Sequence, residues 1–144
     1  MSSSDKKRAR IIKTLSKCGD IPDPERHFKA LLEIKQRFDE EKDKQMLLKV
    51  FDAIGNRERL LILDTLKEKD RCVCELEAIM EKVQASVSHH LRILEQAGLI
   101  QGWKKGKFTH YSLVKCTFTK FTQMLDGWVA STRNWFGDVQ QQAL

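Results

Sequence analysis

Two cysteines separated by one residue carry the most distinctive chemistry of this chain. Cys72 and Cys74 flank Val73, and in an extended backbone residues i and i+2 point to the same side. Both sulfurs can then reach one soft metal ion, because thiolates prefer soft ions. The same pair can instead serve as a redox site, since a helix N-terminus favours the oxidisable thiolate. A third interpretation is that both are small apolar residues at a helix start, with no chemical role.

The stretch that follows has the periodicity of a short amphipathic helix. Val87, Leu91 and Leu94 recur at i, i+4 and i+7, so they share one face that should pack inward. Gly98 is well placed to end this helix in a left-handed conformation. Polar residues able to donate and accept hydrogen bonds fall on or near the other side, namely Ser86, Ser88, His89 and Arg92.

Two short apolar and aromatic runs come next, at 100–103 and 108–113, around a turn that contains Gly106. This pattern predicts a β-hairpin. A helix with a polar outer face, followed by a hairpin with a lysine-rich tip, is the layout of a winged helix-turn-helix DNA-binding domain. We therefore predict that the four polar residues of the helix face the major groove. The lysines expected to meet phosphates or the minor groove are Lys104, Lys105 and Lys107.

Charge is unevenly distributed along the 144 residues, of which 32% are charged and 41% hydrophobic. Residues 1–21 carry six basic and two acidic side chains, and residues 84–114 carry four and one, whereas residues 22–83 carry thirteen and fifteen. Positive charge therefore collects where phosphate attraction is useful. No apolar run approaches the roughly 18 residues of a membrane span. We expect a cytoplasmic protein that contacts no membrane and keeps its cysteines reduced.

Nothing in the sequence supports catalysis. There is no glycine-rich phosphate loop and no paired acid and base, and no Ser-His-Asp set has a supporting motif. His89 and His90 do not form a chelating pair, because adjacent helical side chains diverge by about 100°. We expect a DNA contact for His89, a packing role for His90 and a position in a hairpin strand for His110. The chain is predicted not to be an enzyme.

Four segments of the chain resemble the ArsR/SmtB family of bacterial and archaeal regulators. SVSHHL at 86–91 and LEQAGLI at 94–100 are similar to that family's recognition helix. HYSL at 110–113 resembles the end of its wing, and AIGNRERL at 53–60 resembles the entry into its second helix. The match covers roughly 47–125, with the motifs in the family's order. Together they are far more specific than any one of them alone.

The resemblance implies a mainly α fold with a small β-hairpin and a sequence-specific transcriptional regulator, most often a repressor. CVCEL at 72–76 is similar to the Cys-Val-Cys-Asp-Leu box of the arsenic- and cadmium-responsive members. The ions implied are As(III), Cd(II) or Zn(II). Two thiolates leave such an ion under-coordinated, and the family's use of the N-terminal arm makes Cys18 the next candidate, ahead of Cys116. Thiol redox sensing, and a constitutive architectural or interaction module without a sensor, remain the alternatives.

The chain departs from the family pattern at two places. Relatives usually have Ser or Thr where Val83 stands, and Val cannot accept the hydrogen bond that caps the recognition helix. The start of that helix is therefore predicted to be shifted or less firmly fixed. A second metal site of the family, on the last helix, uses histidines, and residues 115–136 contain none.

Four parts are expected: a basic flexible arm at 1–21, an N-terminal extension helix at 22–46, the winged helix-turn-helix domain at 47–114 and a C-terminal dimerisation helix at 115–144. Asp23 and Pro24 form a good helix start. A helical stripe with many large rings more often meets its copy in a symmetric partner. We predict a homodimer through the N- and C-terminal helices, bound to a palindromic operator. The stripe comprises Phe118, Phe121, Leu125, Trp128 and Trp135.

Overall fold

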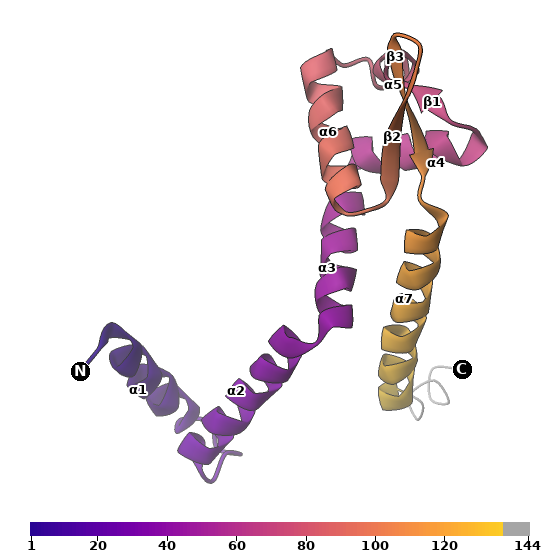
Figure 1. The fold of residues 1–144 in the computed structure, drawn as a ribbon. Helices are drawn as coiled ribbons and strands as arrows, with labels where there is room; N and C mark the ends of the chain where they lie inside the picture. Colours follow the sequence, from indigo (N-terminus) through magenta and orange to yellow (C-terminus); the bar gives the residue numbers. More distant parts are fainter. Residues whose placement is uncertain (137–144) are drawn as a thin grey trace. The chain divides into compact units, whose positions relative to one another are not determined.

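The structure, a computed structural model, describes residues 1–136 and the side chains of residues 1–133. Contacts between residues divide the chain into two units, Met1–Lys42 and Asp43–Leu144, and each is described by itself below. In order along the chain (Figure 1), the elements are α1 (Ser3–Leu15), α2 (Pro24–Glu40), α3 (Lys42–Ile54), α4 (Arg57–Glu68), β1 (Arg71–Cys72), α5 (Val73–Met80), α6 (Gln84–Gln96), β2 (Ile100–Lys105), β3 (Phe108–Leu113) and α7 (Lys115–Phe136).

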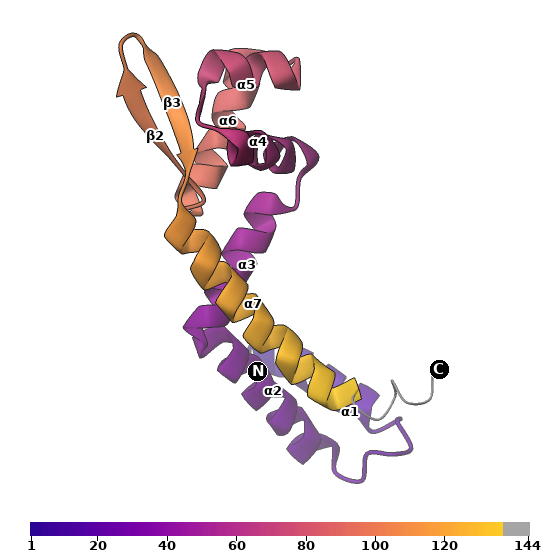
Figure 2. The same ribbon diagram turned by 90° about the vertical axis from the view of Figure 1, so that its right-hand side faces the viewer.

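The second unit is built around one apolar core. Helices α4, α5 and α6 pack beside the β2–β3 hairpin (Figure 2), and the side chains between them are almost wholly shielded from water. Burying each large aliphatic side chain stabilises the fold by about 1.5–3 kcal/mol relative to exposure. The core residues are Val50, Ala53, Ile62, Leu63, Leu66, Leu76, Met80, Val87, Leu91, Leu94, Leu99 and Ile100.

The predicted hairpin is confirmed, and it belongs to a three-stranded antiparallel sheet in the order β1-β3-β2. Ile100 pairs with Leu113 at the base of the hairpin, and Lys105 pairs with Phe108 beside the turn. Gly106 has a φ of +63°, which a residue without Cβ adopts at no steric cost. On the other side of β3, the short β1 pairs Cys72 with His110.

Helix α6 occupies the stretch that the apolar spacing predicted, with Val87, Leu91 and Leu94 buried. Gly98 ends it with a φ of +74°, as expected. Val83 stands at the N-cap position in an extended conformation and makes no side-chain cap bond, which agrees with the expectation for valine. With its side chain 74% exposed, Val83 contributes little packing, so the α6 start relies on backbone hydrogen bonds from Ser86 and Val87 to the Val83 carbonyl.

The first unit is a pair of helices. We predicted a basic flexible arm for residues 1–21, but the helix α1 forms there. The Ser2 hydroxyl accepts a hydrogen bond from the Asp5 backbone at 3.2 Å, and the Asp5 carboxylate accepts one from the Ser2 backbone at 3.0 Å. This reciprocal cap stabilises the helix start. Helix α2 begins at Pro24 with Asp23 as its cap, as predicted.

Helix α7 continues directly from the hairpin. Phe118 and Phe121 are half-buried against the core, and the Phe121 ring lies edge-on to Phe51 at 5.6 Å between centroids. Further along, Leu125 is half-buried and Trp128 is 46% exposed. The stripe predicted for dimerisation is thus divided between packing in its own chain and exposed surface. The Trp135 side chain lies outside the described residues. No helix in residues 1–136 is long and apolar enough to cross a membrane.

Candidate nucleic-acid interface

The start of α6 and the tip of the β2–β3 hairpin lie at the same end of the second unit. Figures 1 and 2 both show the turn between β2 and β3 at the end where α6 begins, with α7 leaving from the opposite end. The core explains this arrangement, since Leu94, Leu99 and Ile100 bury the α6–β2 junction and make the hairpin run back alongside the helix. The hairpin is therefore placed as the wing of a winged helix.

The four polar residues predicted on the outer face of α6 differ in exposure. His89 and Arg92 are exposed, whereas Ser86 and Ser88 are half-buried at the flanks of the buried stripe. A guanidinium can form a bidentate hydrogen-bonded pair with guanine in the major groove, so an exposed Arg92 has the chemistry of a base contact. The two hydroxyls lie nearer the helix edges, where a phosphate contact is the simpler geometry.

Two further exposed residues stand in the first turn of α6 and were not predicted. Gln84 and Ala85 are exposed, and the N-terminal residues of a recognition helix are the ones that approach base edges. A glutamine there can pair with adenine through both amide atoms. Helical spacing drew attention to the apolar positions from Val87 onward, and only the capping position of Val83 could have indicated Gln84.

The wing presents its three predicted lysines to solvent. Lys104, Lys105 and Lys107 are all exposed. Behind them, the rings of Trp103 and His110 stack at 4.9 Å between centroids, 25° from parallel, on directly paired positions of β2 and β3. The Trp103 indole N–H donates a hydrogen bond of 2.8 Å to the Ser112 hydroxyl. These cross-strand contacts stabilise the hairpin that carries the three lysines at its tip.

Arg59 connects α6 to the rest of the unit, and its role was not predicted. From α4, its guanidinium donates hydrogen bonds to the backbone carbonyls of Asp52 and Ala53 in the last turn of α3. Its Nη1 also lies 3.4 Å from Nδ1 of His90 on α6. One side chain therefore contacts three helices. Asn56 helps to place it, since the Asn56 side chain accepts a hydrogen bond from the Arg59 backbone at 3.2 Å.

His90 is held close to neutral by this arrangement. Burial lowers the pKa of His90 below its ordinary value of 6.5, and the positive charge of Arg59 lowers the pKa further. The neutral ring can accept a hydrogen bond from the guanidinium, which a protonated ring cannot do. The packing role expected for His90 agrees with this geometry, while His89 next to it faces solvent.

The two neighbouring cysteines lie at the start of α5. Cys72 ends β1 and caps the helix, while Cys74 already stands in its first turn, so the extended backbone assumed for the pair covers only Cys72. The helix closes early because the Glu75 carboxylate accepts a hydrogen bond of 2.9 Å from the Cys72 backbone N–H. That bond lowers the pKa of Glu75. The helical backbone at Cys74 does not separate the pair, because the side chains of Cys72 and Cys74 still interact directly.

The electrostatics of the pair differ from those expected at a helix N-terminus. Desolvation by the atoms around it raises the pKa of Cys74, and the charge of Cys72 and a hydrogen bond with Cys72 raise the pKa further. Cys72 is half-buried, while Cys74, Cys18 and Cys116 are exposed and free. Cys18 belongs to the first unit. In the described part of the chain, no three His, Cys, Asp or Glu side chains form a group that could hold a metal ion.

Comparison with known proteins identifies the family. Residues 56–101 match the model of the bacterial regulatory protein, arsR family. Over 78 residues the chain is 35% identical to an uncharacterized HTH-type transcriptional regulator of Methanocaldococcus jannaschii, and the alignment covers 54% of this chain and 88% of that protein. The chain belongs to the ArsR family. It is accordingly a transcriptional regulator with a winged helix-turn-helix DNA-binding fold, and not an enzyme.

Two further relatives extend this result. The chain is 41% identical over 66 residues to a cadmium resistance transcriptional regulatory protein, a CadC homolog, of Staphylococcus aureus; the alignment covers 45% of this chain and about half, 54%, of that protein. An ArsR-like transcriptional regulator from Rhodococcus sp. RHA1 has the same fold, with a TM-score of 0.59 at 23% identity over 69% of this chain and 93% of the other.

Proposed function

We propose that this ArsR-family chain is a repressor that binds double-stranded DNA with α6 in the major groove and the wing along the backbone. The observation that supports this most strongly is the common end shared by the first turns of α6 and the lysine-bearing hairpin tip (Figure 1). Arg92 and His89 are the candidates for base contacts, with Gln84 added from the first turn of α6, and Ser86 and Ser88 complete the face toward the major groove at its edges. Lys104, Lys105 and Lys107 of the wing are the candidates for phosphate contacts.

The experiment is a binding titration with the duplex enriched from a random pool and with an unrelated duplex, at several salt concentrations. Arg92→Ala should relax sequence preference, costing on the order of 1–3 kcal/mol on the enriched duplex. Lys105→Gln should weaken both duplexes alike and reduce the salt slope by about one unit. Gln96→Ala and Lys69→Gln, exposed in the last turn of α6 and after α4, are the matched controls. Wild-type behaviour of both test variants would remove the assignment.

The functional unit is proposed to be a homodimer on a palindromic operator. Support comes from the exposed ring of Trp128 and the half-buried Leu125, which follow Phe118 and Phe121 along α7. Trp128→Ala should give monomers in sedimentation at micromolar concentration and weaken operator binding, because a single half-site loses the avidity of two. Gln123→Ala, exposed on the same helix, should remain dimeric. A monomeric wild-type protein would contradict both the interface and the palindrome.

Control by the cysteine thiols completes the proposal. Similarity to a cadmium resistance regulatory protein supports a soft metal ion as the signal. Cys72 and Cys74 supply two sulfurs whose side chains interact. Two donors do not fill the coordination of As(III), Cd(II) or Zn(II), so Cys18 is proposed as the third, with Cys116 as the remaining candidate. A bound ion would draw these thiolates together at the start of α5, which packs on α6. That displacement would change operator affinity.

Single Cys→Ser variants test this control against the redox alternative. Operator release is measured with As(III), Cd(II) and peroxide, and the bound metal is measured by native mass spectrometry without reductant. Loss of the metal response in Cys72→Ser and Cys74→Ser would support metal sensing. A response to peroxide alone, reversed by dithiol reductant and abolished by Cys116→Ser or Cys18→Ser, would support redox sensing. Wild-type responses from all four variants would leave a regulator without a cysteine sensor.

A further inference from the structure

Helix α1 carries a stripe of basic side chains that the recognition elements do not include. Lys6, Arg10 and Lys13 are spaced i, i+4 and i+7, so they lie on one face of the helix over about 10 Å of its axis. All three are exposed, and Lys7 lies beside them, also exposed. In the described part of the chain, no ion pair engages any of these four side chains.

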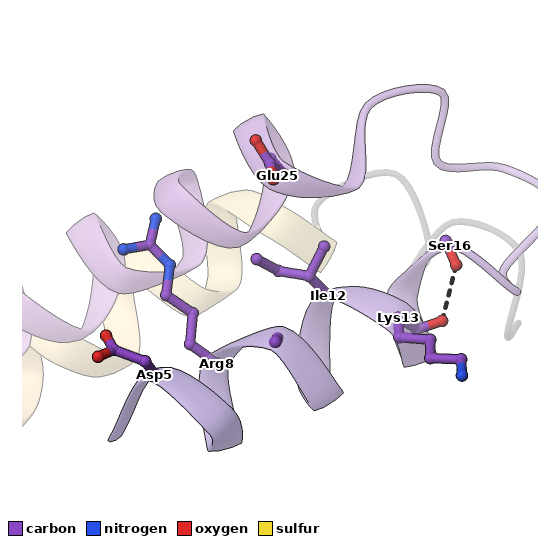
Figure 3. Close-up of a pocket in the computed structure, with 7 residues that line it drawn as sticks. Asp5, Arg8, Ile12, Lys13, Ser16 and Glu25 are labelled. Carbon is purple, nitrogen blue, oxygen red and sulfur yellow. Dashed lines mark hydrogen bonds between the residues drawn. The ribbon is translucent and has the colours of Figure 1, made fainter. Parts of the chain in front are cut away.

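Packing against α2 fixes which side of α1 this stripe occupies. The Arg8 guanidinium lies over the Phe28 ring, 5.6 Å from its centroid, and Phe28 is the buried residue of α2. Figure 3 shows Arg8 and Ile12 pointing toward α2, with Glu25 on the facing helix, while Lys13 points away from it. The helix therefore uses one face for α2 and leaves the Lys6, Arg10 and Lys13 face to solvent.

The two helices of the first unit differ in net charge, which distinguishes the basic stripe of α1 from a surface of mixed charge. Helix α1 has five basic side chains and one acid, Asp5, whose carboxylate is engaged by Ser2. Helix α2 has four basic and four acidic side chains, including the exposed pair of Lys35 and Asp39. Of these two helices, α1 alone therefore carries a net positive charge. The wing carries one in the second unit.

We propose that the Lys6, Arg10 and Lys13 face of α1 is a third DNA contact, which binds phosphates without reading sequence. The inference rests on the proposed DNA binding by α6 and the wing. Duplex DNA presents one negative charge per about 1.7 Å of axis, so a basic stripe of about 10 Å can meet several phosphates. The stripe lies outside the residues matched by the family, so it extends the DNA contact beyond the common domain.

The test compares two triple variants with the same change in net charge. One replaces Lys6, Arg10 and Lys13 with glutamine, a residue of similar helix propensity, so α1 should persist in circular dichroism. The control replaces Lys29, Lys35 and Arg37 of α2, which are exposed and scattered around that helix. Binding to a random-sequence duplex is measured by fluorescence anisotropy across several salt concentrations, and then to the enriched operator.

The α1 variant should bind both duplexes more weakly, by roughly 10- to 100-fold near 0.1 M salt, and its salt slope should be smaller by about 1–3 units. Its preference for operator over random sequence should be unchanged, unlike that of Arg92→Ala. An α1 variant with the slope of the α2 control would overturn this inference alone. Binding to phosphatidylserine vesicles is measured in parallel. If the α1 variant loses vesicle binding but binds both duplexes like the α2 control, the inference would be overturned in favour of a membrane surface. Failure of the wild-type chain to bind any duplex would overturn the proposed function itself.

Discussion

The two units of the chain bury their apolar residues to very different extents. The second unit encloses a core of twelve residues, whereas the first buries Phe28 and leaves other large apolar side chains of α2 about half exposed, namely Leu31, Leu32, Ile34 and Phe38. The second unit therefore obtains its stability from its own packing. Within the first unit, the helices are stabilised by their caps and by the contact of Arg8 with Phe28.

The largest expected effect tests this difference directly. Leu91→Ala should destabilise the second unit by about 2–5 kcal/mol, because Leu91 is buried at the centre of the core and its truncation leaves a cavity. Phe28→Ala should lower the helical signal of the first unit but leave the main denaturant midpoint unchanged. Both are measured by circular dichroism in urea. Equal shifts of the midpoint would show that the two units unfold together and share one core.

Arg59 should contribute the next largest effect. Arg59→Met keeps most of the side-chain volume but leaves the carbonyls of Asp52 and Ala53 without their donor, at a cost of about 1–3 kcal/mol. Operator binding should also weaken, because His90 on the recognition helix loses its partner. Arg57→Met, at an exposed position two residues earlier, is the control. Equal stability of the two variants would show that the contacts of Arg59 are incidental.

A gain of stability is expected at the start of α6. Val83→Ser should supply the missing cap and stabilise the second unit by about 0.5–2 kcal/mol, since a hydroxyl can accept a hydrogen bond from the first turn. Val83→Ala removes the side chain without adding an acceptor and should be close to neutral. Thermal unfolding measures both. A serine variant no more stable than the alanine variant would mean that the backbone bonds to Val83 already satisfy this end.

The smallest expected effect is a pH dependence from His90. Because its pKa is lower in the folded chain than in the unfolded chain, the unfolded state takes up the proton first as pH falls. The contribution of His90 to stability is therefore complete above about pH 7 and declines as pH falls below 6.5 toward the folded pKa. The charges around it include Arg59, His89, Glu58 and Lys82. His90→Gln should flatten this part of the stability profile, and an unchanged profile would exclude His90 as its source.

Helix α6 and the β2–β3 hairpin could be predicted from the sequence because their features are local. Apolar spacing defined α6, Gly98 and Gly106 adopt the positive φ values expected of them, and the absence of a cap at Val83 follows from its side chain. The family, the winged fold and the regulatory class were also predicted correctly. The DNA contacts and the dimer interface remain predictions.

Other features depend on contacts that no spacing reveals. Helix α1 has few apolar residues, and it packs through an arginine over an aromatic ring, which hydrophobic periodicity does not detect. In the sequence Arg59 resembles any exposed basic residue, and only the folded structure shows that it lies on α4 and contacts both α3 and α6. At Cys74 the extended backbone assumed for the cysteine pair was wrong, because α5 already begins at Val73, where the Glu75 carboxylate accepts a hydrogen bond from the Cys72 backbone.

Selection from a pool of random duplexes tests the central claim most directly. The wild-type chain should enrich an inverted repeat whose half-sites are centred about one helical turn, 10–10.5 base pairs, apart. Arg92→Ala should enrich a less defined sequence, while the α2 control triple should enrich the same repeat as the wild type. Enrichment of no sequence, or of one indifferent to Arg92, would contradict the assignment of α6 and the wing as the DNA-reading surface.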